Sequence, residues 1–171
     1  MRITAAVVTI MMVASAGVAS ADAGLLPGDR EFINEAAQGN LMEVMAGKLA
    51  AQRALDPAVK NFGQQMVSDH TAANETLKSL ADSKQMPLAD SVSPPEHDAL
   101  GKLEGLNGTE FDKAYSKLMV KDHTDDIAKF EKALKKVKDP DVKAYAEQTL
   151  PTLRHHLMLA NRLSSAAQKS P

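Results

Sequence analysis

The chain has 171 residues and a formal net charge of −2, from 20 Lys and Arg against 22 Asp and Glu, and it contains no cysteine. The missing cysteines exclude a disulfide scaffold and thiolate metal sites, and a near-neutral charge without a basic block argues against nucleic acid as a partner. Helix-favouring residues dominate, and only two tyrosines and four phenylalanines are present, so we predict an all-α fold.

The first 21 residues have the features of an export signal. One basic residue precedes an apolar run from Ile3 to Ala14, and Ala19-Ser20-Ala21 is a small-x-small cleavage pattern. The apolar run is shorter than the roughly 20 residues that a membrane-spanning helix needs. We therefore predict cleavage near Ala21 and a mature domain over residues 22–171. The product is expected in the periplasm or secreted, without stable membrane insertion and, lacking cysteine, without a lipoprotein anchor.

Four long helices are predicted in the mature chain, over about residues 29–54, 57–85, 109–138 and 140–166. Clusters of Pro, Gly and Asp separate them. Asp56-Pro57 and Asp139-Pro140 each read as an N-cap followed by the first helical residue, because the missing N–H of proline costs nothing at that position.

The connections between these helices differ in length. Two or three residues join the first pair and likewise the second pair, so each pair must be an antiparallel hairpin. About 23 residues separate the second helix from the third, which is enough to travel the length of a bundle and makes these two helices parallel. The sequence therefore predicts a ferritin-like four-helix bundle with a long crossover. A short helix around Pro95 to Glu104 is expected to cover one side through Leu100 and Leu103.

One six-residue phrase occurs twice, as MVSDHT over residues 66–71 and as MVKDHT over residues 119–124. Helical spacing places His70 and His123 in the apolar stripes of their helices, with the preceding aspartates about 100° away on the flank. Both histidines lie about 14 residues into parallel helices, so they share one level of the bundle. At that level the first helix offers a glutamate and the fourth a histidine. The side chains predicted to meet in this layer are Glu43, Asp69, His70, Asp122, His123 and His156.

Two interpretations of this layer remain open. Three imidazoles and several carboxylates between facing helices suit a transition metal such as Fe, Mn, Zn or Cu, with the histidines as ligands and the acids as ligands or orienting acceptors. Alternatively, neutral histidines hydrogen-bonded to aspartates form a metal-free network that fixes helix register. The first predicts a non-catalytic periplasmic metal-binding protein. The second predicts a structural or stress-related envelope protein that acts through its surface, by self-association or with an envelope partner.

Catalytic motifs are missing from the chain. Bundles that hold two metal ions carry Glu-x-x-His on two helices, and this pattern occurs nowhere here. A metal-dependent oxidase is therefore the weakest of the three hypotheses, and the protein is not predicted to be an enzyme. Met66 and Met119, one turn before the twin histidines, are expected to fill the core rather than to bind copper. Asp125 and Asp126 are expected on a solvated helix face.

Four stretches carry a resemblance to a known family: AAQGNLMEVMAGKLA, FGQQMVSDHTAANETL, FDKAYSKLMVKDHTDDIAKFE and TLPTLRHHLMLA. They resemble a bacterial family of exported ferritin-like proteins, known as domain of unknown function 4142 and often labelled outer-membrane proteins. The resemblance covers essentially the whole mature chain and implies the same fold and location, but no activity. The positions that it singles out are Glu43, Asp69, His70, Phe111, Asp112, Tyr115, Asp122, His123, Pro151 and His156.

Overall fold

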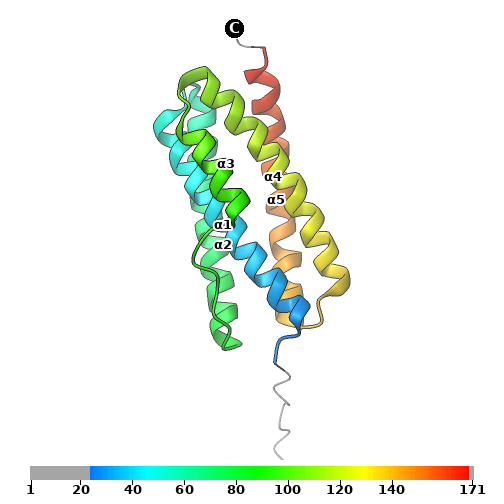
Figure 1. Cartoon of the computed structure of the whole chain (residues 1–171). Helices are drawn as coiled ribbons and strands as arrows, with labels where there is room; N and C mark the ends of the chain where they lie inside the picture. Colours follow the sequence, from blue (N-terminus) through cyan, green and yellow to red (C-terminus); the bar gives the residue numbers. More distant parts are fainter. Residues whose placement is uncertain (1–23, 170–171) are drawn as a thin grey trace, which may run out of the picture.

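The computed structural model describes residues 24–169 of the chain. Within that range it contains five α-helices and no strand (Figure 1). The helices are α1 (Pro27–Arg53), α2 (Pro57–Ser83), α3 (Pro94–Glu104), α4 (Gly108–Lys136) and α5 (Pro140–Ala167). The predicted all-α class is therefore confirmed, whereas the predicted signal over residues 1–21 lies outside the described residues.

Proline and aspartate set the helix starts. Proline occupies the first turn of α1, α2, α3 and α5, where its missing N–H leaves no helical hydrogen bond unmade. The Asp56 carboxylate accepts the N–H of Ala58 at 2.8 Å, and the Asp139 carboxylate accepts the N–H of Asp141 at 2.9 Å. Both aspartates are N-caps, so the two predicted caps are confirmed.

The four long helices lie side by side as two hairpins (Figure 1). α1 packs most extensively against α2, and α4 against α5, while α1 also contacts α4 and α2 contacts α5. α2 and α4 run in the same direction because the segment between them returns along the outside of α1 (Figure 1). That segment contains α3, which packs against α1 and α4 and buries Leu100 and Leu103 as predicted.

Two aspartates link the ends of the two hairpins through hydrogen bonds. The Asp112 carboxylate at the start of α4 accepts the backbone N–H groups of Leu55 and Asp56, at 3.1 and 2.9 Å. At the opposite end, the Asp29 carboxylate accepts the N–H of Lys138 at 2.9 Å. Each carboxylate satisfies backbone groups of the turn in the other hairpin, which fixes the height of one hairpin relative to the other.

Two apolar clusters fill the interior, one toward each end of the long helices. One contains Phe32, Leu77 and Phe130, and the other contains Met66 and Met119, which are fully buried as expected. Between the clusters lies a layer of buried polar side chains. The buried polar residues of this layer are Asn40, Glu43, His70, His123, Asp126 and His156.

Candidate metal centre

Each long helix places at least one buried titratable side chain in the same layer. Glu43 of α1 and His70 of α2 are 1% and 2% exposed, and His123 of α4 and His156 of α5 are fully buried. The ring centres of the three histidines form a triangle with sides of 5.8, 5.3 and 5.3 Å. The fixed rise of a helix thus brings together residues that are up to 113 positions apart in the sequence.

One nitrogen of His123 and one of His156 are held by acceptors outside the triangle. His123 Nδ1 lies 3.0 Å from the carbonyl oxygen of Met119. Because a carbonyl can only accept, Nδ1 carries the proton and Nε2 keeps its lone pair. His156 Nε2 lies 2.9 Å from Asp69 Oδ2. A carboxylate likewise accepts, so Nε2 is the protonated nitrogen of His156 and Nδ1 keeps the lone pair.

His70 is oriented by the side-chain amide of Asn40, a residue that was not among the predicted members of the layer. His70 Nδ1 lies 3.0 Å from Asn40 Oδ1, and Asn40 Nδ2 donates to the hydroxyl oxygen of Tyr145 at 3.3 Å. The bond to Tyr145 uses the amide nitrogen of Asn40 and turns its oxygen toward His70. His70 Nδ1 is therefore the donor, and His70 Nε2 keeps the lone pair.

The three remaining nitrogens, His70 Nε2, His123 Nε2 and His156 Nδ1, are buried and form no hydrogen bond with any residue that the structure describes. Burial lowers the pKa of His70 and of His156 to about 4, and it also lowers the pKa of His123, so all three rings are neutral at pH 7. The rings can each contribute one ligand atom to a set whose members lie within 4.8 Å of one another. Neutral imidazoles with the outer nitrogen hydrogen-bonded and the inner one free are the usual form of metal-binding histidines.

Glu43 lies between two of the histidines. Its Oε2 is 2.7 Å from His70 Nδ1, and its Oε1 is 3.1 Å from His123 Nε2. Neither contact has hydrogen-bond geometry, and both oxygens lack a hydrogen-bond partner among the described residues. Burial raises the pKa of Glu43 to about 8, so the carboxyl group is mostly protonated at pH 7 when no cation is bound. A carboxylate in this position would complete a ligand set of three histidines and one acid.

Asp126 is buried, at 7% exposure, although the sequence predicted a solvated position. The Asp126 carboxylate fits against α1 because residue 39 is glycine: a Cβ at Gly39 would lie 3.3 Å from Asp126 Oδ2. Its other oxygen, Oδ1, pairs with Lys129 Nζ at 2.8 Å. The neighbouring Asp125 does lie on the surface and pairs with Lys121, so only half of that prediction was wrong.

Asp122 belongs to a carboxylate group beside the histidines. Glu43, Asp122 and Asp126 can each offer an oxygen to a set whose members lie within 4.8 Å of one another. Burial first, and then the negative charge of Glu43, raises the pKa of Asp122 well above its usual range. Asp122 Oδ2 is buried and has no hydrogen-bond partner among residues 24–169. Burial therefore favours the protonated forms of Glu43 and Asp122 in the metal-free protein.

The stability of the metal-free protein is expected to peak near pH 6.5. The folded-state pKa values of His70 and His156, about 4 against an ordinary 6.5, mean that unfolding takes up protons below pH 6.5, so acid destabilises the fold. The folded-state pKa of Glu43, about 8 against an ordinary 4.5, has the opposite effect. The folded chain keeps a proton that the unfolded chain has lost, and stability falls from pH 6.5 to 8 by up to about 1.4 kcal/mol per pH unit.

Urea unfolding in the presence of a chelator, at about pH 5, 6.5 and 8, measures this profile. Between pH 4.5 and 6.5 the histidines with lowered pKa values outnumber the acids with raised pKa values. The free energy of unfolding should therefore rise with pH in this range. The Glu43→Gln variant is the control, since a neutral amide should reduce the fall above pH 6.5. A wild-type chain equally stable at pH 6.5 and 8 would contradict the burial of a protonated Glu43.

The fold of this chain is shared by solved structures that include two DUF305 proteins. A DUF305 fragment from Deinococcus radiodurans is 14% identical, with a TM-score of 0.75, and the match covers 84% of this chain and 99% of that one. A DUF305 protein from Streptomyces coelicolor, described as a candidate secreted protein, is 15% identical, with a TM-score of 0.71 over 82% and 92% of the two chains. At such low identities the likeness establishes the helical fold alone.

The sequence model of a family described as a domain of unknown function, DUF4142, matches residues 14–163. The match includes every residue of the histidine layer, and it confirms the resemblance carried by the four stretches quoted above. A comparison with curated proteins gave no match. The chemistry of the layer must therefore be argued from its own residues.

Proposed function

The chain belongs to the DUF4142 family, a domain of unknown function, and we propose that it binds one divalent transition-metal ion in the middle of the bundle. The ligands are His70, His123 and His156, with Glu43 as the fourth. The observation that carries the proposal is the set of three neutral imidazoles, each with its outer nitrogen hydrogen-bonded and its inner nitrogen buried without a partner.

A metal-free hydrogen-bond network accounts for these contacts less well. Such a network explains the outer bonds to Asn40, to the carbonyl of Met119 and to Asp69. It leaves unexplained why three lone pairs and the Glu43 carboxyl gather without hydrogen bonds in one buried layer. Buried polar atoms without partners are rare and costly in folded proteins. A cation bound by all of them removes that cost.

The ligand set narrows the choice of ion. Imidazole and carboxylate ligands without thiolate suit Zn²⁺, Cu²⁺, Fe²⁺ and Mn²⁺. The protein would supply three neutral nitrogens and one negative oxygen, so the complex with a divalent ion would carry a net charge of +1. The adjacent acids, Asp122 and Asp126, could offset that charge. No reaction follows from this arrangement, and binding is the function proposed.

We further assign the arrangement of the long helices to the ferritin-like four-helix bundle, and we propose that the protein is exported after cleavage near Ala21. The two hairpins and the parallel course of α2 and α4 support the fold assignment (Figure 1). The apolar run from Ile3 to Ala14 supports export. Among the described residues no helix is both long and apolar enough to cross a membrane.

Elemental analysis of the untagged protein, isolated without chelators, tests the metal proposal. The wild-type chain is expected to carry about one transition-metal ion, as mononuclear sites with this ligand set do. The double variant His70→Ala, His123→Ala should carry none. The His155→Ala variant, which changes an exposed neighbour of His156, should retain the wild-type content. A wild-type chain that holds no metal, even after loading with Fe, Mn, Zn and Cu, would overturn the proposal and favour the structural alternative.

A further inference from the structure

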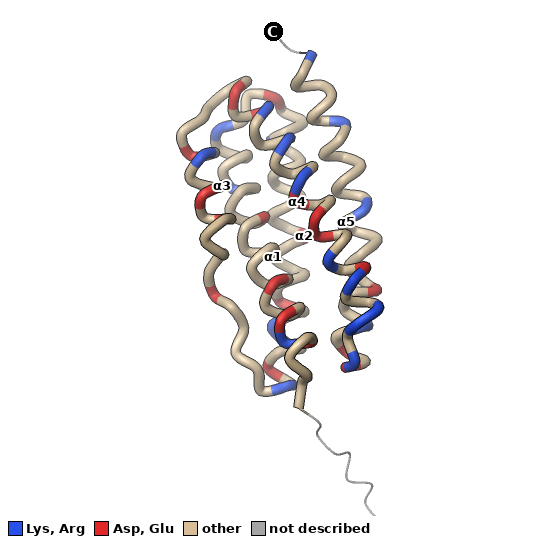
Figure 2. The backbone as a smooth tube through the Cα atoms, turned by 45° about the vertical axis from the view of Figure 1, so that its right-hand side comes forward, with Lys and Arg blue, Asp and Glu red and all other residues tan. Residues whose placement is uncertain are grey.

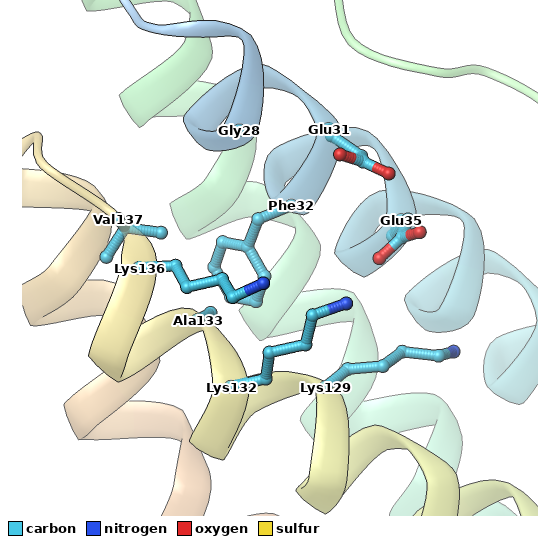
Figure 3. Close-up of a pocket in the computed structure, with 9 residues that line it drawn as sticks. All are labelled: Gly28, Glu31, Phe32, Glu35, Lys129, Lys132, Ala133, Lys136 and Val137. Atoms are coloured by element: carbon cyan, nitrogen blue, oxygen red, sulfur yellow. The ribbon is translucent and has the colours of Figure 1, made fainter.

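The histidine layer is closed to solvent, but the surface is hollowed on two sides of the bundle close to it. The hollow between α1 and α4 is small, at ≈ 140 Å³, and its three lysines and two glutamates leave an excess of one positive charge. Lys129, Lys132 and Lys136 reach from α4 toward α1, where Glu31 and Glu35 lie (Figure 3). Lysine positions gather along this half of α4 (Figure 2). Positive charge on this side opposes the approach of a cation.

The second hollow is a groove of ≈ 360 Å³ between α2 and α5. Its lining consists of alanines, threonines, a glutamine, the edge of Tyr145 and one acid, Asp69, and no lysine or arginine is among the residues that line it. Ala73 lies about one turn after His70 on α2, and Thr152 lies one turn before His156 on α5. The groove therefore begins about one turn along α2 and α5 from two of the three histidines.

Asp69 connects this groove to the buried layer. Its side chain is 35% exposed, whereas the side chains of Glu43, His70, His123 and His156 are at most 3% exposed. Asp69 Oδ2 lies 2.9 Å from His156 Nε2 and also accepts a hydrogen bond from Gln65 at 3.3 Å. It is thus the one carboxylate in contact with a histidine of the layer that solvent also reaches, among the residues described.

We propose that the metal ion enters and leaves the histidine layer through the groove between α2 and α5, with Asp69 as its first ligand. This inference rests on the proposed metal-binding function. A carboxylate at the mouth attracts a divalent cation, while the lysines on the α1–α4 side repel it, and steering of this kind changes association rates by about tenfold or more. Of the two seams between the hairpins, α2 and α5 pack less extensively than α1 and α4, so the bundle opens more easily along the α2–α5 seam.

Stopped-flow uptake and release of Co²⁺ by the metal-free full-length mature chain tests the route. Ala73→Phe and, separately, Thr152→Phe fill the groove, and each is expected to lower the association and dissociation rates together by about tenfold, leaving Kd unchanged. A blocked route raises the barrier without altering the bound state. Asp69→Asn, which keeps an oxygen for His156 but loses the charge, should lower the association rate. Lys132→Phe, in the opposite hollow, is the matched control and should lower neither rate, because it adds a phenylalanine away from the route and removes a charge that repels the cation.

The outcomes separate this inference from the function on which it rests. If the wild-type chain binds none of Co²⁺, Zn²⁺, Cu²⁺, Fe²⁺ and Mn²⁺ at equilibrium, the metal proposal and the route both fail. If it binds a metal ion but both groove variants exchange Co²⁺ at wild-type rates, the route alone is overturned. The same conclusion follows if Lys132→Phe slows exchange while the groove variants do not. Because the two groove positions lie on different helices, the test still stands if one of the variants folds poorly. An unchanged Kd shows that the metal site of a variant is intact.

Discussion

Alanine at His70, His123 or His156 is expected to abolish nearly all of the stability that metal confers on the fold. At a free metal concentration about 100 times the wild-type Kd, binding to the folded state alone raises the free energy of unfolding by about 2.7 kcal/mol. Each of the three histidines supplies one of the inward nitrogens, so its removal should weaken binding enough to cancel this increment. Urea unfolding with and without a chelator measures the increment in each variant.

The His155→Ala variant distinguishes a ligand effect from a general effect of losing a histidine on α5. His155 is exposed and is not among the histidines that could share a metal ion, so its variant should keep the full metal increment. The competing network hypothesis predicts a different pattern. If the buried histidines only make hydrogen bonds, each alanine variant should lose about 1–3 kcal/mol whether or not a chelator is present. Equal losses in the two conditions would therefore speak against a metal centre.

The composition of the layer was largely predictable because helix geometry is regular. A rise of about 1.5 Å per residue and the short hairpin connections place His70, His123 and His156 at one height without any knowledge of side-chain packing. Glu43 follows from the same count along the first helix. The heights of these residues in the bundle depend only on where each helix starts, which proline and aspartate mark in the sequence, and on the direction in which each helix runs.

Asp126 and Asn40 were missed for two different reasons. Asp126 follows Asp122 by four residues and His123 by three, so helical spacing places it on the same face, and this signal was present in the sequence. Its burial also requires the space beside Gly39, which depends on how closely α1 approaches α4. Asn40 matters through its bond to Tyr145, 105 residues away. Which nitrogen of His70 and of His156 stays free depends on such distant partners, about which local spacing contains no information. For His123 the partner is the local carbonyl of Met119.

Gly63→Ala is expected to destabilise the metal-free protein by about 3 kcal/mol, because α1 and α2 touch backbone to backbone at this position. A Cβ at Gly63 would lie 2.6 Å from Ala50 Cβ and 2.8 Å from the carbonyl oxygen of Gly47. Neither atom belongs to a flexible side chain, so the helices must move apart to accept the methyl group. The better helix propensity of alanine, worth about 1 kcal/mol, offsets only part of this cost. Urea unfolding with a chelator measures the difference.

Gly101→Ala is the matched control, because a Cβ at Gly101 in α3 meets nothing within 4 Å. There the same substitution should stabilise the fold by up to about 1 kcal/mol. Separating α1 from α2 should also displace Glu43 from the proposed site. Glu43 lies one turn before Gly47, and its Oε2 is 2.7 Å from His70 Nδ1. Gly63→Ala should therefore weaken metal binding as well as stability, whereas Gly101→Ala should change neither the Kd nor the metal content. A Gly63→Ala chain with wild-type stability and Kd would show that the α1–α2 contact tolerates separation and does not position Glu43.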